Sequence, residues 1–332
     1  MSESLDQVKA FGARFDALRS ELGRVIVGQT GLVDLVLTGL FAGGHCLLEG
    51  LPGLGKTQLV KTLSDCLGLA SSRVQFTPDL MPADVTGTNI IVEDEKGRRT
   101  LQFRRGPVFT NLLLADEINR ATPKTQSALL EAMQEANVTV WGETHVIARP
   151  FLVLATQNPI EMEGTYPLPE AQLDRFLFKI LVPRPSTADL VEIAHRTTRR
   201  ETTQLINDTA TAEILEWQGL VREVVCAPPV LGFAARLVAA SHPDDEAAPP
   251  RVREFVRFGA SPRAVQGLVL AAKVAALRDG RANVAFVDVK RVVAPVLRHR
   301  LVLGYQAMGE GVTADQLVAD ILAAVTEREE SD

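Results

Sequence analysis

The chain has 332 residues, of which 46% are hydrophobic and 23% charged, and its formal net charge is −6 at pH 7. This length predicts about two domains. A composition this apolar can bury a sizeable core, which excludes disordered, collagen-like and disulfide-rich chains. The acidic balance argues mildly against a protein that coats nucleic acid, although a local basic face stays possible.

The cellular compartment is predicted from what the sequence lacks. Cys46, Cys66 and Cys226 lie far apart and form no metal-ligand pair, so we expect small apolar residues of a reducing compartment. Residues 1–9 are polar and show no signal peptide. No apolar stretch reaches the roughly 20 residues that a membrane helix needs. We therefore expect a cytoplasmic protein without membrane insertion.

The predicted elements begin with a helix and continue as alternating strands and helices. Residues 1–22 carry apolar side chains at helical intervals and predict an amphipathic N-terminal helix. Five continuously apolar runs follow, a pattern typical of parallel strands that are covered on both faces. They span residues 45–49, 73–77, 111–115, 151–156 and 178–182.

After Pro183 and Pro185 the periodicity is helical, without convincing strands, so we place a domain boundary at residues 183–186. Two inserts interrupt the α/β half, between Thr77 and Asn111 and between Glu135 and Phe151. The second is predicted to be a hairpin. Trp141, beside its turn, is interpreted either as a contact point for a partner or as a packed aromatic, with packing favoured.

A phosphate-binding loop is predicted directly after the first apolar run. Residues 50–57 read G-x-x-x-x-G-K-T and stand between that run and a helical stretch, which is the context that the motif requires. Glycines let backbone N–H groups surround a phosphate, and a helix N-terminus adds its dipole. The alternative is a chance glycine-rich turn. The residues predicted to bind nucleotide here are Gly50, Pro52, Gly53, Leu54, Gly55, Lys56, Thr57 and Gln58.

Two further apolar runs end in polar residues that suit hydrolysis. Asp116 and Glu117 follow residues 112–115, and Asn158 follows residues 151–156. In a parallel sheet such residues meet at the carboxyl edge, where ligands bind. We expect Asp116 and Thr57 to hold Mg²⁺, Glu117 to activate water, and Asn158 to position that water or contact the γ-phosphate. The alternatives are a helix-capping acid pair and a turn-forming asparagine.

These motifs closely resemble those of the MoxR family of AAA+ ATPases, and the match covers roughly residues 22–307. It is carried by residues 48–57, 77–87, 115–133, 155–176, 259–264 and 295–300. The resemblance implies an AAA+ α/β core over residues 23–185, with a helix-2 insert at about 78–108 and a pre-sensor hairpin at about 137–150. A small all-α lid domain over residues 186–332 would follow.

The resemblance also implies roles for single residues. Asn158 matches sensor 1, Arg263 matches sensor 2, and Arg175 matches the arginine finger that a neighbouring subunit supplies. Val27 and Gly28 match the adenine side of the nucleotide site. The alternatives are an ion pair of Arg175 with a nearby carboxylate and a solvated lid arginine at position 263. Arg120, beside the acid pair, is another candidate interface arginine.

The family resemblance implies Mg²⁺-dependent ATP hydrolysis in a homo-oligomeric ring, expected to be a hexamer, that remodels or matures client protein complexes. Relatives often act alongside von Willebrand factor A domain proteins, so such a protein is a candidate partner. A binding module controlled by nucleotide with low turnover is a second hypothesis. A chelatase-like or nucleic-acid motor is a third hypothesis. The basic residues of 251–300 argue against a nucleic-acid motor, because they are dispersed among apolar positions rather than interleaved with stacking aromatics.

Overall fold

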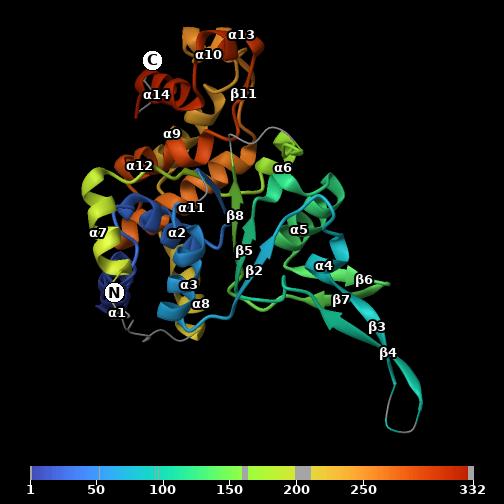
Figure 1. Ribbon diagram of the computed structural model, residues 1–332. Coiled ribbons are helices and arrows are strands. Elements are labelled where there is room, and N and C mark those ends of the chain that lie inside the picture. Colours follow the sequence, from blue (N-terminus) through green and yellow to red (C-terminus); the bar gives the residue numbers. More distant parts are fainter. Residues whose placement is uncertain are drawn as a thin grey trace.

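A computed structural model describes residues 2–51, 53–93, 95, 97–158, 164–198 and 211–327 (Figure 1). Its centre is a five-stranded parallel sheet with the order β2-β5-β8-β1-β9. All five predicted apolar runs form its strands. Their bounds are β1 Cys46–Glu49, β2 Ser71–Gln75, β5 Leu112–Asp116, β8 Leu152–Gln157 and β9 Phe178–Leu181.

Successive residues of the central strands face two separate apolar clusters, which explains their unbroken hydrophobicity. Leu48, Leu114 and Leu154 pack with the helices that start the chain and with the lid, whereas Leu47 and Val153 pack on the other face. Helices α2 Thr30–Ala42 and α3 Lys56–Leu67 cover the first face, and α4 Pro82–Thr86 and α5 Pro123–Glu135 cover the second. The predicted α/β sheet with flanking helices is confirmed.

The N-terminal helix α1, Ser2–Gly23, is part of the core. Its apolar stripe, Val8, Phe11, Phe15, Leu18 and Leu22, is buried. The Phe11 ring meets Phe41 of α2 edge-on at 5.1 Å between centroids and Trp217 of the lid at 5.8 Å. This helix therefore joins the two halves of the molecule through aromatic packing.

Two antiparallel hairpins lie within the segments expected to be inserts. The longer one, β3 Gly87–Glu93 with β4 Arg99–Arg105, projects away from the sheet (Figure 1). The shorter one is β6 Asn137–Val140 with β7 Glu143–Val146. His145 stacks on Phe103 at 3.8 Å between ring centroids, which joins the two hairpins.

Trp141 corrects the favoured interpretation of this aromatic. It begins the turn between β6 and β7 in the left-handed region, with φ of 52°, and its neighbour Gly142 has φ of 85°. This pair of positive φ values is what a two-residue hairpin turn requires. The indole is 74% exposed, so it is not packed against the described part of the chain.

The C-terminal half is helical, as predicted, with one small addition. Strands β10 Val256–Phe258 and β11 Val302–Leu303 pair as a short antiparallel ladder that hydrophobic periodicity did not indicate. A three-residue or two-residue strand is too short for its pattern to stand out. The helices are α7 Thr187–Thr197, α8 Thr211–Glu223, α9 Pro228–Ala239, α10 Pro250–Phe255, α11 Pro262–Arg278, α12 Phe286–Leu297, α13 Tyr305–Glu310 and α14 Ala314–Ala324.

The lid is attached to the sheet through the chain that follows α12. His299 accepts no hydrogen bond from the described residues at Nδ1, and its Nε2 donates to the Phe176 carbonyl at 3.0 Å. Arg298 donates to the Lys179 carbonyl at 3.2 Å. Three consecutive lid residues, Arg298 to Arg300, thus bind the backbone that leads into β9.

Acid is expected to loosen this junction. Burial, together with the nearby charges of Arg300, Lys179 and Arg298, holds the pKa of His299 well below its ordinary 6.5. Because the unfolded chain takes up this proton below pH 6.5 while the folded one does not, stability falls as the pH drops. The ordinary pKa of 6.5 in the unfolded chain limits the resulting loss of folding stability between pH 7 and pH 5 to at most about 2 kcal/mol. Urea unfolding of wild type and His299→Gln across this range measures it, and parallel curves would contradict it.

In the part of the chain described here, no helix has both the length and the apolar character to cross a membrane.

Candidate functional site

The loop between β1 and α3 has the backbone geometry that phosphate binding needs. Gly53 and Gly55 have φ of 81° and 78°, in the left-handed region where a side chain would be strained. Gly55 directly precedes α3, so the N–H groups of the first helical turn have no partners within the helix. Pro52 lies outside the described residues. The loop therefore offers free N–H groups and a helix dipole to an anion.

The Lys56 ammonium lies across this loop, where it donates to the Gly50 carbonyl at 2.7 Å. Burial lowers the pKa of Lys56, and the charges of Asp116, Glu117 and Glu49 oppose this. The amine is therefore one of the cations that balance the three carboxylates. A bound phosphate would offer it a fully charged acceptor in place of a carbonyl.

The paired acids end β5 in the centre of the sheet. Thr156, which is buried on the adjacent strand β8, donates its hydroxyl to Asp116 Oδ1 at 2.6 Å and accepts the Glu117 N–H at 2.8 Å. Glu117 has φ of 56°. The left-handed conformation is strained for a residue other than glycine, so surrounding contacts must stabilise it. The hydrogen bond to Thr156 is such a contact. One hydroxyl thereby fixes both acids.

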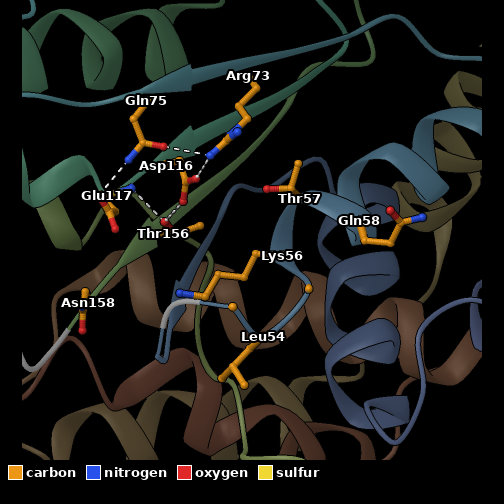
Figure 2. A pocket seen from close by; sticks show the side chains of 12 residues that line it. Leu54, Lys56, Thr57, Gln58, Arg73, Gln75, Asp116, Glu117, Thr156 and Asn158 are labelled. Carbon is orange, nitrogen blue, oxygen red and sulfur yellow. Dashed lines mark hydrogen bonds and ion pairs between the residues drawn. The ribbon is translucent and has the colours of Figure 1, made fainter. Parts of the chain in front are cut away.

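Arg73 and Gln75 are site residues that the sequence analysis missed. Arg73 Nη2 donates to Asp116 Oδ2 at 2.7 Å, and Gln75 Nε2 donates to Glu117 Oε2 at 2.7 Å (Figure 2). Both lie on β2, two residues apart and therefore on one face. Their signal in the sequence is this alternation, and it becomes readable only once β2 is known to neighbour β5.

These groups surround a cavity of about 500 Å³ at the carboxyl edge of the sheet. Figure 2 shows Lys56 and Thr57 reaching in from the loop and α3, opposite Asp116 and Glu117, with Asn158 at one end. Of the predicted nucleotide-site residues, the cavity brings together most of the loop, both acids and Asn158. Its lining residues are Gly53, Leu54, Gly55, Lys56, Thr57, Gln58, Arg73, Gln75, Asp116, Glu117, Thr156 and Asn158.

The donor set of the cavity fits Mg²⁺. Thr57 supplies a hydroxyl and Asp116 a carboxylate, and Mg²⁺ prefers such oxygen ligands, few of them from protein, beside water and phosphate. Among the described residues, no group of three or more His, Cys, Asp or Glu side chains could hold a metal by itself.

The segment predicted to lie on the adenine side adjoins the cavity without lining it. Val27 and Gly28 are absent from the residues that surround it. A side chain at Gly28 would collide with the Asp189 carboxylate at the start of α7, so this segment touches the lid. Gln29, the residue that follows Gly28 in this segment, donates to the Leu54 carbonyl at 3.2 Å.

Arg175 and Arg263 lie away from this cavity. Arg175 precedes β9 by a few residues, and Leu177 donates its N–H to the His45 carbonyl, just before β1, at 2.8 Å. Both points are at the amino edge of the sheet, opposite the phosphate loop. Arg175 and Arg263 line a second, smaller cavity there, of about 110 Å³, together with His45, Met133 and Gln134.

Ion-pair partners bear on the other interpretations of the arginines. Asp174 pairs with Arg300 at 2.8 Å and with Arg263 at 3.6 Å rather than with its neighbour Arg175. Arg120 lies 3.2 Å from the carboxylate of Glu117 in the same chain. Arg263 thus lies next to a carboxylate of the core, and Arg120 pairs with Glu117 of its own chain.

Thr156→Val is expected to lower both stability and activity. Valine keeps the shape but leaves the buried Glu117 N–H without its acceptor, which costs about 1 to 3 kcal/mol. It also releases Asp116, so we expect kcat for nucleotide hydrolysis to fall about tenfold. Thr156→Ser keeps the hydroxyl and serves as the control. Urea unfolding and steady-state hydrolysis test this, and a valine variant as stable and active as the serine variant would refute it.

Comparisons with known proteins agree with this geometry. A family model described as "ATPase family associated with various cellular activities (AAA)" matches residues 45–178, and one for an "AAA lid domain" matches residues 234–321. The chain is 45% identical over 307 residues to Chaperone MoxR1 of Mycobacterium tuberculosis, covering 92% of this chain and 80% of that one.

It is 34% identical over 324 residues to Protein MoxR of Paracoccus denitrificans, with 88% and 89% of the two chains covered. A crystal structure of a candidate ATPase from Cytophaga hutchinsonii superposes with a TM-score of 0.91. That protein is 38% identical, and the superposition covers 98% of each chain.

Proposed function

Because the chain belongs to the MoxR family of AAA+ ATPases, we propose that it hydrolyses Mg²⁺-bound ATP to remodel or mature client protein complexes. The observation that carries this proposal is the convergence of the phosphate loop, the acid pair and Asn158 on one cavity. In this proposal residues 23–185 are the ATPase core and residues 186–332 the lid.

Binding of the triphosphate would use the loop and its lysine. Backbone N–H groups from Gly53 to Thr57 surround the β-phosphate, and Lys56 exchanges the Gly50 carbonyl for β- and γ-phosphate oxygens. Thr57 and Asp116 would hold Mg²⁺, which neutralises phosphate charge as it develops. Arg73, which donates to Asp116 Oδ2 at 2.7 Å, lies beside this proposed metal site.

Hydrolysis needs a base for the attacking water and a group that places this water. Glu117 is the base in our proposal, because it is the carboxylate that faces the cavity beyond the metal ligand. Gln75 and Arg120 hold one of its oxygens, at 2.7 Å and 3.2 Å. Asn158, which is buried at the end of β8, orients the water or contacts the γ-phosphate.

The arginines at the amino edge support assembly into a ring. Neither Arg175 nor Arg263 lines the cavity of its own chain. A guanidinium stabilises the charge that develops on the γ-phosphoryl group, and it can come from another chain. We propose that both act on the nucleotide of a neighbouring subunit in a homo-oligomeric ring, a hexamer as in the family expectation.

The client is proposed to be a protein, since one relative bears the name chaperone. A von Willebrand factor A domain protein stays the candidate partner. The hairpins offer exposed apolar side chains for contact: Ile91 and Leu101 pair across β3 and β4 at 70% and 60% exposure, and Trp141 is exposed on β6–β7. The cytoplasmic location expected from the sequence stays a prediction.

A nucleotide-dependent pull-down tests the proposal. Glu117→Gln protein, loaded with ATP and Mg²⁺, should retain client proteins that ADP-loaded protein and Lys56→Ala protein release. The captured client should raise the wild-type ATPase rate severalfold. Capture without any stimulated hydrolysis would favour the binding module of low turnover. Stimulation by DNA instead, lost steeply with added salt, would favour the nucleic-acid motor.

A further inference from the structure

Asp174 is the point at which the lid contacts the segment that carries Arg175. Its carboxylate accepts the Ser261 hydroxyl at 2.9 and 2.8 Å, on its two oxygens, and Arg300 Nε at 2.8 Å. Arg263 lies 3.6 Å away. Asp174 directly precedes Arg175 in sequence, so every one of these lid contacts acts next to that arginine.

Arg300 binds the same segment through its backbone. The guanidinium is 3% exposed, and it donates to the carbonyls of Asp174 at 3.1 Å, Phe176 at 2.7 Å and Leu177 at 3.3 Å. It also donates to the Val296 carbonyl at the end of α12. With the bond to the Asp174 carboxylate, these acceptors match the five N–H donors of an arginine.

This pattern clamps Arg175 between fixed points. One lid side chain binds the carbonyls of residues 174, 176 and 177, so the backbone on both sides of Arg175 is held. The same carboxylate holds Ser261, whose hydroxyl caps α11 by accepting the Arg263 N–H at 3.2 Å. Asp174 therefore fixes the first turn of α11, which carries Arg263, as well as its own neighbour.

A need for fixed geometry explains this buried ion pair better than a need for stability. Buried pairs are often no more stabilising than apolar residues of similar volume, because both charges lose their water. Catalytic rate is sensitive to the placement of catalytic groups, and a displacement of about 1 Å can lower the rate about 100-fold. The ion pair lies next to Arg175 and Arg263, two arginines from different parts of the chain that line the same cavity.

We propose that Asp174 and Arg300 are positioning residues, which hold Arg175 and Arg263 as one unit toward the nucleotide of the neighbouring subunit. The inference rests on the proposed function, since it assumes that these arginines act across an interface. It adds that the lid, through Arg300 and Ser261, holds Arg175 of the core and its own Arg263 in one fixed arrangement.

Asp174→Asn and Arg300→Lys test the inference. Each should lower kcat for ATP about 10- to 100-fold and leave KM unchanged, because the arginines act on charge that develops during cleavage. Mixing either variant with Glu117→Gln subunits should restore turnover, since those subunits still carry correctly placed arginines. Ser261→Ala, which removes only the hydroxyl, should lower kcat severalfold with the same rescue, and it stays informative if the other variants do not fold.

Asp320→Asn is the matched control, because it breaks a different lid ion pair, Arg251–Asp320 at 2.9 Å, and should keep the wild-type kcat. Wild-type kcat in folded Asp174→Asn protein would overturn the inference. A loss that mixing does not rescue, while Arg175→Ala is rescued in the same assay, would overturn it too. Failure of Arg175→Ala itself to be rescued would overturn the trans arrangement of the proposed function, and the inference with it.

Discussion

Changing Glu117 to glutamine is expected to leave ATP binding intact and to lower kcat about 100- to 1,000-fold. The amide keeps the size of the side chain and one oxygen that can still accept from Gln75, so the cavity should keep its shape. It cannot take a proton from water at neutral pH. Binding and turnover therefore separate at this position.

Calorimetry with ATP and Mg²⁺, beside a steady-state hydrolysis assay, measures the two effects. Lys56→Ala is the matched comparison. It removes the ammonium group that is proposed to leave the Gly50 carbonyl and bind the phosphates, so this variant should lose tight ATP binding. A Glu117→Gln protein that turns over like wild type would show that another group activates the water. Equal ATP affinity in wild type and Lys56→Ala would contradict the assigned phosphate loop.

The Arg175→Ala protein is expected to bind ATP normally and to hydrolyse it about 1,000-fold more slowly or worse, the range known for arginines supplied in trans. Arg175 is proposed to stabilise charge that develops on the γ-phosphoryl group during cleavage, so ATP affinity should stay close to that of wild type. The loss should belong to the site of the neighbouring subunit. Arg175 makes no ion pair with another described residue, so its removal should cost little stability.

Mixing experiments decide where this arginine acts. Equal amounts of Arg175→Ala and Glu117→Gln subunits, each nearly inactive alone, should together exceed the sum of their separate rates. A ring formed from both places some intact acids opposite intact arginines. Proven co-assembly without any gain in rate would mean that Arg175 does not act across the interface.

The sequence predicted what depends on local pattern. The strands, the phosphate loop and the acid pair each occupy a short stretch whose residue types match one requirement, such as glycine at positions 53 and 55 for positive φ. The exposure of Trp141 was harder to predict, because an aromatic side chain beside a turn is buried only if another part of the chain packs against it. In the described chain Trp141 stays 74% exposed.

What the sequence could not predict depends on neighbours that are distant along the chain. Arg73 contacts Asp116 because β2 is the strand beside β5, and strand order is not written in either segment. Arg263 matches a nucleotide-sensing position, yet the docking of the lid places it beside Asp174 at the opposite edge. Both results follow from packing between elements, which periodicity within one element does not encode.

The distance between the acid pair and Arg175 has a consequence for a cell that makes this protein. Each copy would carry the acid pair and the arginine at separate places, where they cannot act on the same nucleotide. A single copy would therefore hydrolyse ATP very slowly, whatever the ATP concentration. Specific activity should then climb with protein concentration and collapse on dilution. The cellular concentration of the protein would then limit its ATPase activity, even without a bound regulator.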